Sequence, residues 1–170
     1  MAVPEPASGI VYRRINRQYL AMSEEETWRY LGENDLMFVA FVREDGYPHV
    51  TPVWFVADGR KVYYKASSYK MKVRLAATGK VCCAWESGET YPELKGVVLW
   101  GRCEVIEDPV KVERVNRLMA ERYAGRSWDP ARVPEDWAHR QRTESKTIVE
   151  ISPERTSSWD NSKLNPDSTF

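Results

Sequence analysis

The sequence predicts a mainly β fold, an antiparallel barrel of about six strands decorated by three or four helices. Two observations predict it. Consecutive apolar runs are joined by Asp-Gly turns at 45–46 and 58–59, and the later strand-like runs are connected by hairpins or short helices. A barrel is the simplest architecture for these strands because closure removes exposed sheet edges.

The strands follow from local patterns. Residues 36–42 are almost continuously apolar, which is typical of a strand covered on both faces. Residues 49–56 and 61–66 complete a meander. Pro48 and Pro52 predict an irregularity or a free edge, because proline cannot donate to a ladder. The remaining strands are expected at 80–85, 96–106 and 145–152.

The helices are predicted from their ends. Ser23 and Glu26 form a capping box that begins the first helix, and Gly32 ends it. A short helix is expected over 69–77. Acidic residues followed by Pro109 open a longer one.

The composition indicates a single domain over 1–170, with 1–20 as a loose N-terminal segment and 153–170 as a C-terminal tail. The 25 basic and 25 acidic residues cancel, which argues against general binding of nucleic acid or of a membrane surface. No secretory leader or long apolar stretch is recognised, so we expect a soluble, cytoplasmic protein.

Residues suited to acid–base or metal chemistry are scarce. Cys82, Cys83 and Cys103 are expected to be reduced, buried thiols, and no metal site is expected because adjacent strand residues point to opposite faces. His49 follows a turn and His139 lies in a predicted surface helix, so both are interpreted as surface residues. Catalytic residues are therefore not assigned, and a cofactor would have to carry any chemistry.

One short segment is both basic and rich in hydroxyl groups. If Ser68 caps the following helix, free backbone N–H groups would point outward beside lysines, as in a phosphate site. A solvated basic face on a surface helix explains the same spacing equally well. The segment contains Lys65, Ser67, Ser68, Tyr69, Lys70, Lys72 and Arg74.

Aromatic side chains lie on two neighbouring predicted strands. Trp54 alternates with Val53 and Phe55 across the sheet, and Tyr63 and Tyr64 alternate on the next strand. One face could receive a planar ring, and packing in the core is the alternative. An aromatic sheet edge beside an anion site is what a phosphorylated planar cofactor needs.

At these residues the chain resembles the pyridoxamine 5'-phosphate oxidase-like family, the flavin-binding split β-barrels. It is most similar to the short members that bind flavin mononucleotide (FMN) or the deazaflavin coenzyme F-420. The resemblance implies a six-stranded antiparallel split β-barrel and a homodimer with two cofactor sites at its interface. It also implies an oxidoreductase that transfers hydride between the cofactor and a small planar organic substrate. The shared stretches are 36–42, 45–55, 64–70, 90–97, 101–109 and 155–164.

The resemblance also assigns the cofactor site, residue by residue. Ser68 and Lys70 would hold the phosphate, with Lys65 and Lys72 as supporting charges and Ser67 beside them. The ring system would be edged, largely by backbone, by Pro52, Val53, Trp54, Tyr63 and Tyr64. Weaker candidates, from the partner subunit or the tail, are Tyr91, Lys95 and Trp159.

The sequence departs from the family pattern in two places. Thr51 stands where the full-length oxidases have an arginine, and an extra residue precedes Leu75, so either Lys70 or Lys72 could hold the phosphate. The pyridoxal-binding residues are not recognisable, so pyridoxamine phosphate oxidation is not expected. The missing arginine fits a different cofactor, such as the deazaflavin, which the Trp-Asp-x-x-Lys-Leu motif at 159–164 slightly favours.

Two other hypotheses stay open at this point. One is a non-catalytic protein of the same fold that binds a flavin, a haem or another planar ligand. The other is a structural dimer that has lost its site.

Overall fold

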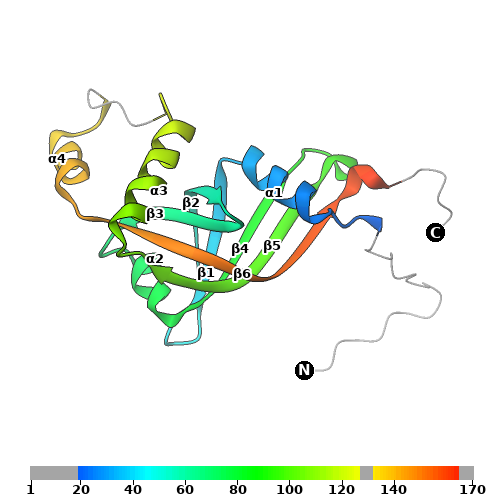
Figure 1. Cartoon of the computed structure of the whole chain (residues 1–170), viewed down its shortest axis with the longest axis horizontal. Coiled ribbons are helices and arrows are strands. Elements are labelled where there is room, and N and C mark those ends of the chain that lie inside the picture. The colour runs from blue at the N-terminus through cyan, green and yellow to red at the C-terminus, as the bar shows by residue number, and fades with distance from the viewer. Residues whose placement is uncertain (1–18, 127–131, 165–170) are drawn as a thin grey trace.

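The computed structural model describes residues 19–126 and 132–164, and within them the chain forms a closed barrel of antiparallel strands in the order β1-β2-β3-β6-β5-β4 (Figure 1). The mainly β, six-stranded antiparallel barrel expected from the sequence is confirmed. The strands are β1 (Leu36–Val42), β2 (Pro48–Asp58), β3 (Lys61–Ser67), β4 (Lys80–Ser87), β5 (Lys95–Val105) and β6 (Lys146–Asp160).

In the described residues the barrel is decorated by the α-helices α1 (Glu24–Glu33), α2 (Met71–Arg74), α3 (Pro109–Arg122) and α4 (Glu135–Thr143). Short 3-10 turns cover Leu75–Thr78, Tyr91–Glu93 and Asn161–Lys163. The capping box is confirmed, since the Ser23 hydroxyl accepts from the Glu26 N–H and the Glu26 carboxylate accepts from the Ser23 N–H.

The expected helix over 69–77 is wrong in its start and its form. α2 is a single turn whose N-cap is Lys70, with no side-chain capping bond, and a 3-10 turn follows it. The Lys70 N–H instead donates to the Ser67 carbonyl at 3.0 Å, so Ser68 lies inside a tight turn and does not cap the helix. The anion-site argument from a capped helix N-terminus is thereby removed.

The last strand is longer than expected. β6 continues through Asp160, so much of the segment predicted as a C-terminal tail is strand. The reason is pairing at long range, because Ser157 lies opposite Val98 and Trp159 opposite Gly96 on β5. The other segment that was expected to be loose is 1–20, of which residues 1–18 lie outside the described residues. Leu20 at its end is buried, and its carbonyl accepts from the Asp160 N–H at 2.8 Å.

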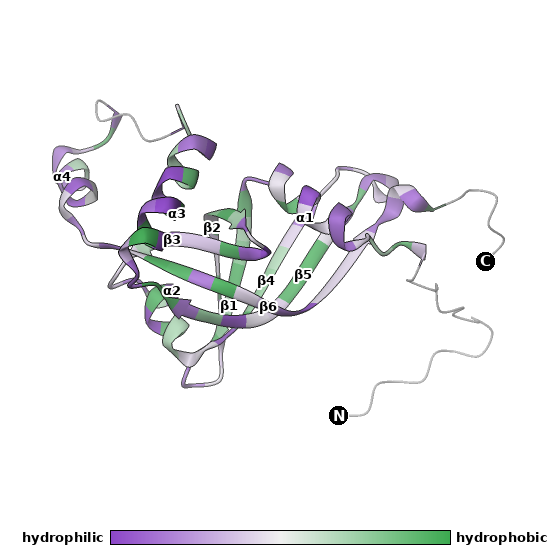
Figure 2. Cartoon of the chain, viewed as in Figure 1, coloured by the Kyte–Doolittle hydropathy of each residue, from purple (hydrophilic) through white to green (hydrophobic). Residues whose placement is uncertain are grey.

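The core fills the barrel and a smaller space beneath α3. Figure 2 shows apolar residues along the strands and mostly hydrophilic ones on α3. Trp85, Tyr64 and Phe55 are the largest side chains that are fully buried. Of the three free cysteines, Cys83 and Cys103 are buried as expected, whereas Cys82 is half-buried.

The barrel opens between β2 and β3. These strands pair only from Phe55 opposite Tyr64 to Asp58 opposite Lys61. Residues 48–54 of β2 pair with β1 and with no other strand that the structure describes. The irregularity predicted from Pro48 and Pro52 therefore takes the form of a strand half with a free edge.

The outer face of the sheet near this opening is apolar and exposed. On β1, Leu36 is 47% and Phe38 44% exposed; on β2, Val50 is 56% and Trp54 40% exposed. Phe38 lies between Pro52 on one side and Ala84 of β4 on the other. Apolar side chains thus run across three neighbouring strands. None of the helices in the described parts of the chain has the length and apolar character needed to cross a membrane.

Candidate functional site

The basic segment at the end of β3 is a compact cluster of charges and hydroxyls. Ser67, the last residue of β3, is buried and lies opposite Lys146 of β6. Its hydroxyl accepts from the Lys146 ammonium at 3.0 Å. Lys65, two residues earlier on β3, donates to the Asn116 side-chain oxygen of α3 at 2.7 Å. This cluster therefore lies where the end of β3 meets the start of β6 and α3.

An acidic side chain lies in the middle of the cluster. The Ser67 hydroxyl donates to Glu144 Oε2 at 2.7 Å and the Tyr69 hydroxyl donates to Glu144 Oε1 at 3.0 Å. The Lys146 ammonium lies 3.3 Å from the same carboxylate. The Ser67 hydrogen bond is the main cause that holds the pKa of Glu144 below its ordinary value, so the carboxylate is charged at neutral pH.

Sequence analysis missed Glu144 and Lys146. Glu144 precedes the last strand and Lys146 begins it, in a stretch with no motif, and only the register that sets Lys146 opposite Ser67 brings them to the cluster. The one available signal was a charged pair at the start of a strand predicted to enter a barrel.

The remaining lysines of the segment also lie close to one another. Burial lowers the pKa of Lys72, and the charge of Lys70 lowers it further. Burial likewise lowers the pKa of Lys65, with a contribution from Lys146. Like charges this close to one another create a local positive potential, which a bound oxyanion would stabilise.

The two predicted phosphate ligands lie on an exposed turn beside this cluster. Ser68 is exposed, and its N–H donates to the Ser145 carbonyl at 3.1 Å. The Lys70 ammonium lies 4.8 Å above the centre of the Tyr69 ring. Both side chains are accessible to a ligand.

The predicted ring-edge residues divide between the free edge and the core. Pro52 and Trp54 are exposed on the unpaired half of β2, while Val53 between them is buried. The Trp54 indole stacks on Tyr123 with ring centres 4.5 Å apart and planes within 3° of parallel. One face of the indole is therefore already covered.

The tyrosines of β3 take the alternative role that was predicted for them, packing in the core. The Tyr64 side chain is fully buried, and its hydroxyl donates to the Lys72 carbonyl at 2.8 Å. Tyr63 packs beneath α3, where burial and the nearby Glu150 raise its pKa to about 12. Only their backbone could edge a ligand.

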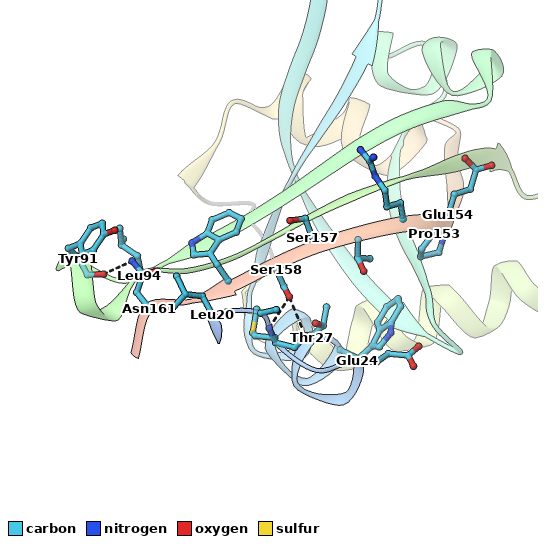
Figure 3. Close-up of a pocket in the computed structure, with 16 residues that line it drawn as sticks. Leu20, Glu24, Thr27, Tyr91, Leu94, Pro153, Glu154, Ser157, Ser158 and Asn161 are labelled. Atoms are coloured by element: carbon cyan, nitrogen blue, oxygen red, sulfur yellow. Dashed lines mark hydrogen bonds between the residues drawn. The ribbon is translucent and has the colours of Figure 1, made fainter. Parts of the chain in front are cut away.

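A second group of candidates surrounds a groove of about 1000 Å³ between α1 and the second half of β6 (Figure 3). Tyr91 is 62% exposed at its rim, where its carbonyl accepts from the Asn161 side chain at 2.8 Å. The Trp159 ring packs flat over Gly96, since a Cβ at position 96 would lie 2.1 Å from it. Lys95 does not line the groove; it forms an ion pair with Asp160 at 2.9 Å.

The two groups of candidates lie at opposite ends of β6 (Figure 1). Lys146 begins the strand at the basic cluster, and Trp159 lies thirteen residues further along it. At roughly 3.3 Å per residue this is a path of about 43 Å. One mononucleotide cannot contact both groups within a single chain.

The sequence profile of the pyridoxamine 5'-phosphate oxidase family matches residues 23–158. The chain belongs to that family. No curated protein sequence matches it.

Several solved structures are similar to the chain. A conserved hypothetical protein from Mycobacterium tuberculosis is 27% identical, with a TM-score of 0.74 over 91% of this chain and 96% of that one. An FAD-binding protein from Mycobacterium smegmatis is 16% identical, with a TM-score of 0.60 over 82% of this chain and 95% of that one. The flavocytochrome Anf3 from Azotobacter vinelandii is 21% identical, with a TM-score of 0.62 over 85% of this chain and 71% of that one. The last two show the shared fold.

Thr51, the position at which the sequence resemblance implies an arginine in the oxidases, lies on β2 opposite Val39 and brings no charge to the basic cluster. Glu144 adds a negative charge there instead. Among the described residues no group of three His, Cys, Asp or Glu side chains is placed to hold a metal ion.

Proposed function

We propose that this protein is a homodimeric oxidoreductase that binds a flavin or the deazaflavin coenzyme F-420 and transfers hydride between that cofactor and a small planar organic substrate. The observation that carries the proposal is the opening of the β2–β3 ladder directly beside the basic cluster at the end of β3. Flavin-binding proteins among the similar structures support it.

The opening offers the two kinds of contact that such a cofactor needs. The unpaired half of β2 has a free backbone edge near Val53 and Trp54 that can line a planar ring. The turn with Ser68 and Lys70 offers a hydroxyl and a charge for a phosphate. The protein would thus bind, orient and shield the ring from water, and the cofactor would supply the hydride chemistry.

A second copy of the chain completes the proposed site. The candidates at Tyr91 and Trp159 lie too far along β6 to reach a ligand held at the basic cluster of the same chain. In a two-fold dimer each end of one chain can meet the other end of its partner. The exposed apolar face around Phe38 is the surface we assign to that contact.

Binding titrations test the cofactor. FMN and the deazaflavin are titrated separately into the apo-protein, following cofactor fluorescence. The Lys70→Ala change is expected to weaken binding by ~1.5–3 kcal/mol, the loss of a charge-assisted hydrogen bond. If Lys72 is the phosphate ligand instead, Lys72→Ala shows this loss of affinity. Lys80→Ala, an exposed lysine on β4, is the control. Unchanged affinity in both variants would remove the phosphate assignment.

The dimer is tested separately. Phe38→Glu places a charge in the apolar face and is expected to give monomers by size-exclusion chromatography with light scattering. Val110→Glu, on an α3 residue that is 75% exposed, should leave the dimer intact. A Phe38→Glu protein that stays dimeric would place the interface elsewhere.

Binding without turnover is the second candidate function. It is favoured by the position of the Tyr64 hydroxyl, which is buried and committed to the Lys72 carbonyl and therefore cannot serve as a proton donor. Burial raises the pKa of Tyr64 far above its ordinary value. A protein that binds the reduced cofactor but does not speed its oxidation by any planar acceptor would support this function.

A further inference from the structure

The proposed phosphate site contains a fixed negative charge. Glu144 ends α4, and its carboxylate lies between the Ser67 and Tyr69 hydroxyls beside the Lys146 ammonium. Phosphate and carboxylate oxygens accept hydrogen bonds from the same donors. Glu144 therefore satisfies donors that a ligand's phosphate would otherwise use.

The carboxylate is held in place from several sides. Its side chain is only 17% exposed. The Glu144 N–H donates to the Arg140 carbonyl at 2.8 Å, and the next carbonyl, that of Ser145, accepts from the Ser68 N–H. An arriving phosphate would meet this charge beside it, because the backbone on both sides of Glu144 is anchored.

We propose that Glu144 is a specificity-determining residue that disfavours a phosphomonoester, as in FMN, relative to a phosphodiester or a flavin without phosphate. This inference rests on the proposed function. A monoester carries close to two negative charges at neutral pH and a diester carries one. Repulsion by Glu144 therefore acts about twice as strongly on the monoester, and it offsets part of the attraction by the lysines, which is also stronger for the monoester.

The same reasoning bears on the choice of cofactor. The deazaflavin attaches its phosphate as a diester, and in FAD the phosphate next to the flavin is one half of a diphosphate with a single charge on each phosphorus; both side chains continue beyond it. The absence of the family's arginine at Thr51 removes a positive charge, and Glu144 adds a negative one. Both differences lower the positive charge available to a terminal phosphate.

The test compares ligands that differ only beyond the flavin ring. Riboflavin, FMN and FAD are titrated into the full-length wild-type protein, Glu144→Gln, Glu144→Asp and the control Glu121→Gln, which changes an exposed carboxylate on α3. Glu144→Gln is expected to raise the affinity for FMN about tenfold relative to riboflavin, and that for FAD by a smaller factor. Glu144→Asp keeps the charge and should stay close to wild type.

The outcomes separate this inference from the proposed function. If every protein binds riboflavin and the ratio of FMN to riboflavin affinity is the same in wild type and Glu144→Gln, the inference is wrong and the flavin site stands. If no protein binds any of the three flavins or the deazaflavin, the proposed function fails as well. Melting temperatures of the four proteins show whether each variant is folded. If Glu144→Gln is not, Glu144→Ala takes its place as the variant without the charge, and Glu144→Asp still shows whether an effect follows the charge.

Discussion

Two carboxylates near the start of β6 carry the same charge in very different surroundings. Glu150 is 1% exposed and is held by Lys61 of β3 and by Lys111 of α3, whose ammonium lies 3.4 Å away. Glu144 lies just before the strand and accepts from two hydroxyls at an edge of the barrel that opens to solvent. Glu150 therefore joins β6 to β3 and α3, whereas Glu144 lies at the proposed phosphate site.

The electrostatics of the two groups explain the difference. Burial raises the pKa of Glu150, but the hydrogen bond and charge of Lys61 together with the charge of Lys111 outweigh it, so its pKa is below the ordinary value. Loss of either lysine contact would leave the buried carboxylate less well compensated, so the role of this contact is structural. At Glu144 the main donor is a neutral hydroxyl, and neutral donors exchange partners at lower cost.

The largest expected effect is on Glu150. Glu150→Ala should lower the free energy of unfolding by about 3 kcal/mol, because it removes two ion pairs and leaves a void under α3. Urea denaturation measures the loss. Glu154→Ala is the matched control, since the ion pair of Glu154 with Arg102 is more than half exposed and contributes about 0.5 kcal/mol or less. Equal losses in both variants would mean that Glu150 has no structural role.

The charge of Glu150 can be separated from its volume by pH. A carboxyl whose pKa is depressed in the folded state stabilises above its unfolded pKa and loses that contribution as pH falls. Glu150→Gln should therefore be about 2 kcal/mol less stable than wild type at pH 7, with the difference shrinking below the ordinary value of 4.5. A difference that stays constant from pH 7 to pH 3 would contradict the charge argument.

A smaller effect is expected at the open carboxylate. Ser67→Ala removes the hydroxyl that joins Glu144 to Lys146 and should cost about 1 kcal/mol of unfolding free energy, the usual value for one buried hydrogen bond. Ser68→Ala, at the exposed neighbouring residue, should leave stability within about 0.3 kcal/mol. If Ser67→Ala costs as much as Glu150→Ala, the two carboxylates are equally structural and the contrast fails.

The smallest effect is expected at Tyr69. Its ring is 57% exposed and its hydroxyl donates to Glu144 at 3.0 Å. Tyr69→Phe should change the unfolding free energy by about 0.5 kcal/mol or less, because water replaces the lost bond at an exposed site. The same variant should weaken FMN binding about twofold if the hydroxyl also meets the phosphate. A large loss of unfolding free energy in Tyr69→Phe would show that the bond between Tyr69 and Glu144 is structural, contrary to this expectation.

Local chemistry made much of the fold predictable. The Asp-Gly turns were foreseen because only a few residues accept positive φ, and Gly46 and Gly59 adopt φ of 85° and 57°. The capping box at Ser23 and the cap at Asp108, whose side chain accepts from the Val110 N–H, depend on neighbours within four residues. Such contacts can be inferred without knowing where the rest of the chain lies.

The length of β6 and the roles of the tyrosines were not predictable in this way. Residues 153–158 are polar and have no strand alternation of their own, and β5 keeps them extended. Tyr63 and Tyr64 have the pattern of a ligand-facing strand, yet α3 covers one and the barrel interior encloses the other. Burial of one side of a strand depends on which element packs there.

The sequence by itself determined the order of the strands along the chain, the Asp-Gly turns and the caps at Ser23 and Asp108, because each depends on short-range pattern. The succession of shared stretches along the chain indicated the family. The sequence also identified the basic segment from Lys65 to Lys72 as a candidate anion site. The tertiary structure alone decided what lies beside that segment. Glu144 is 77 residues from Ser67, and barrel closure by β3–β6 pairing is the physical reason that the two side chains meet.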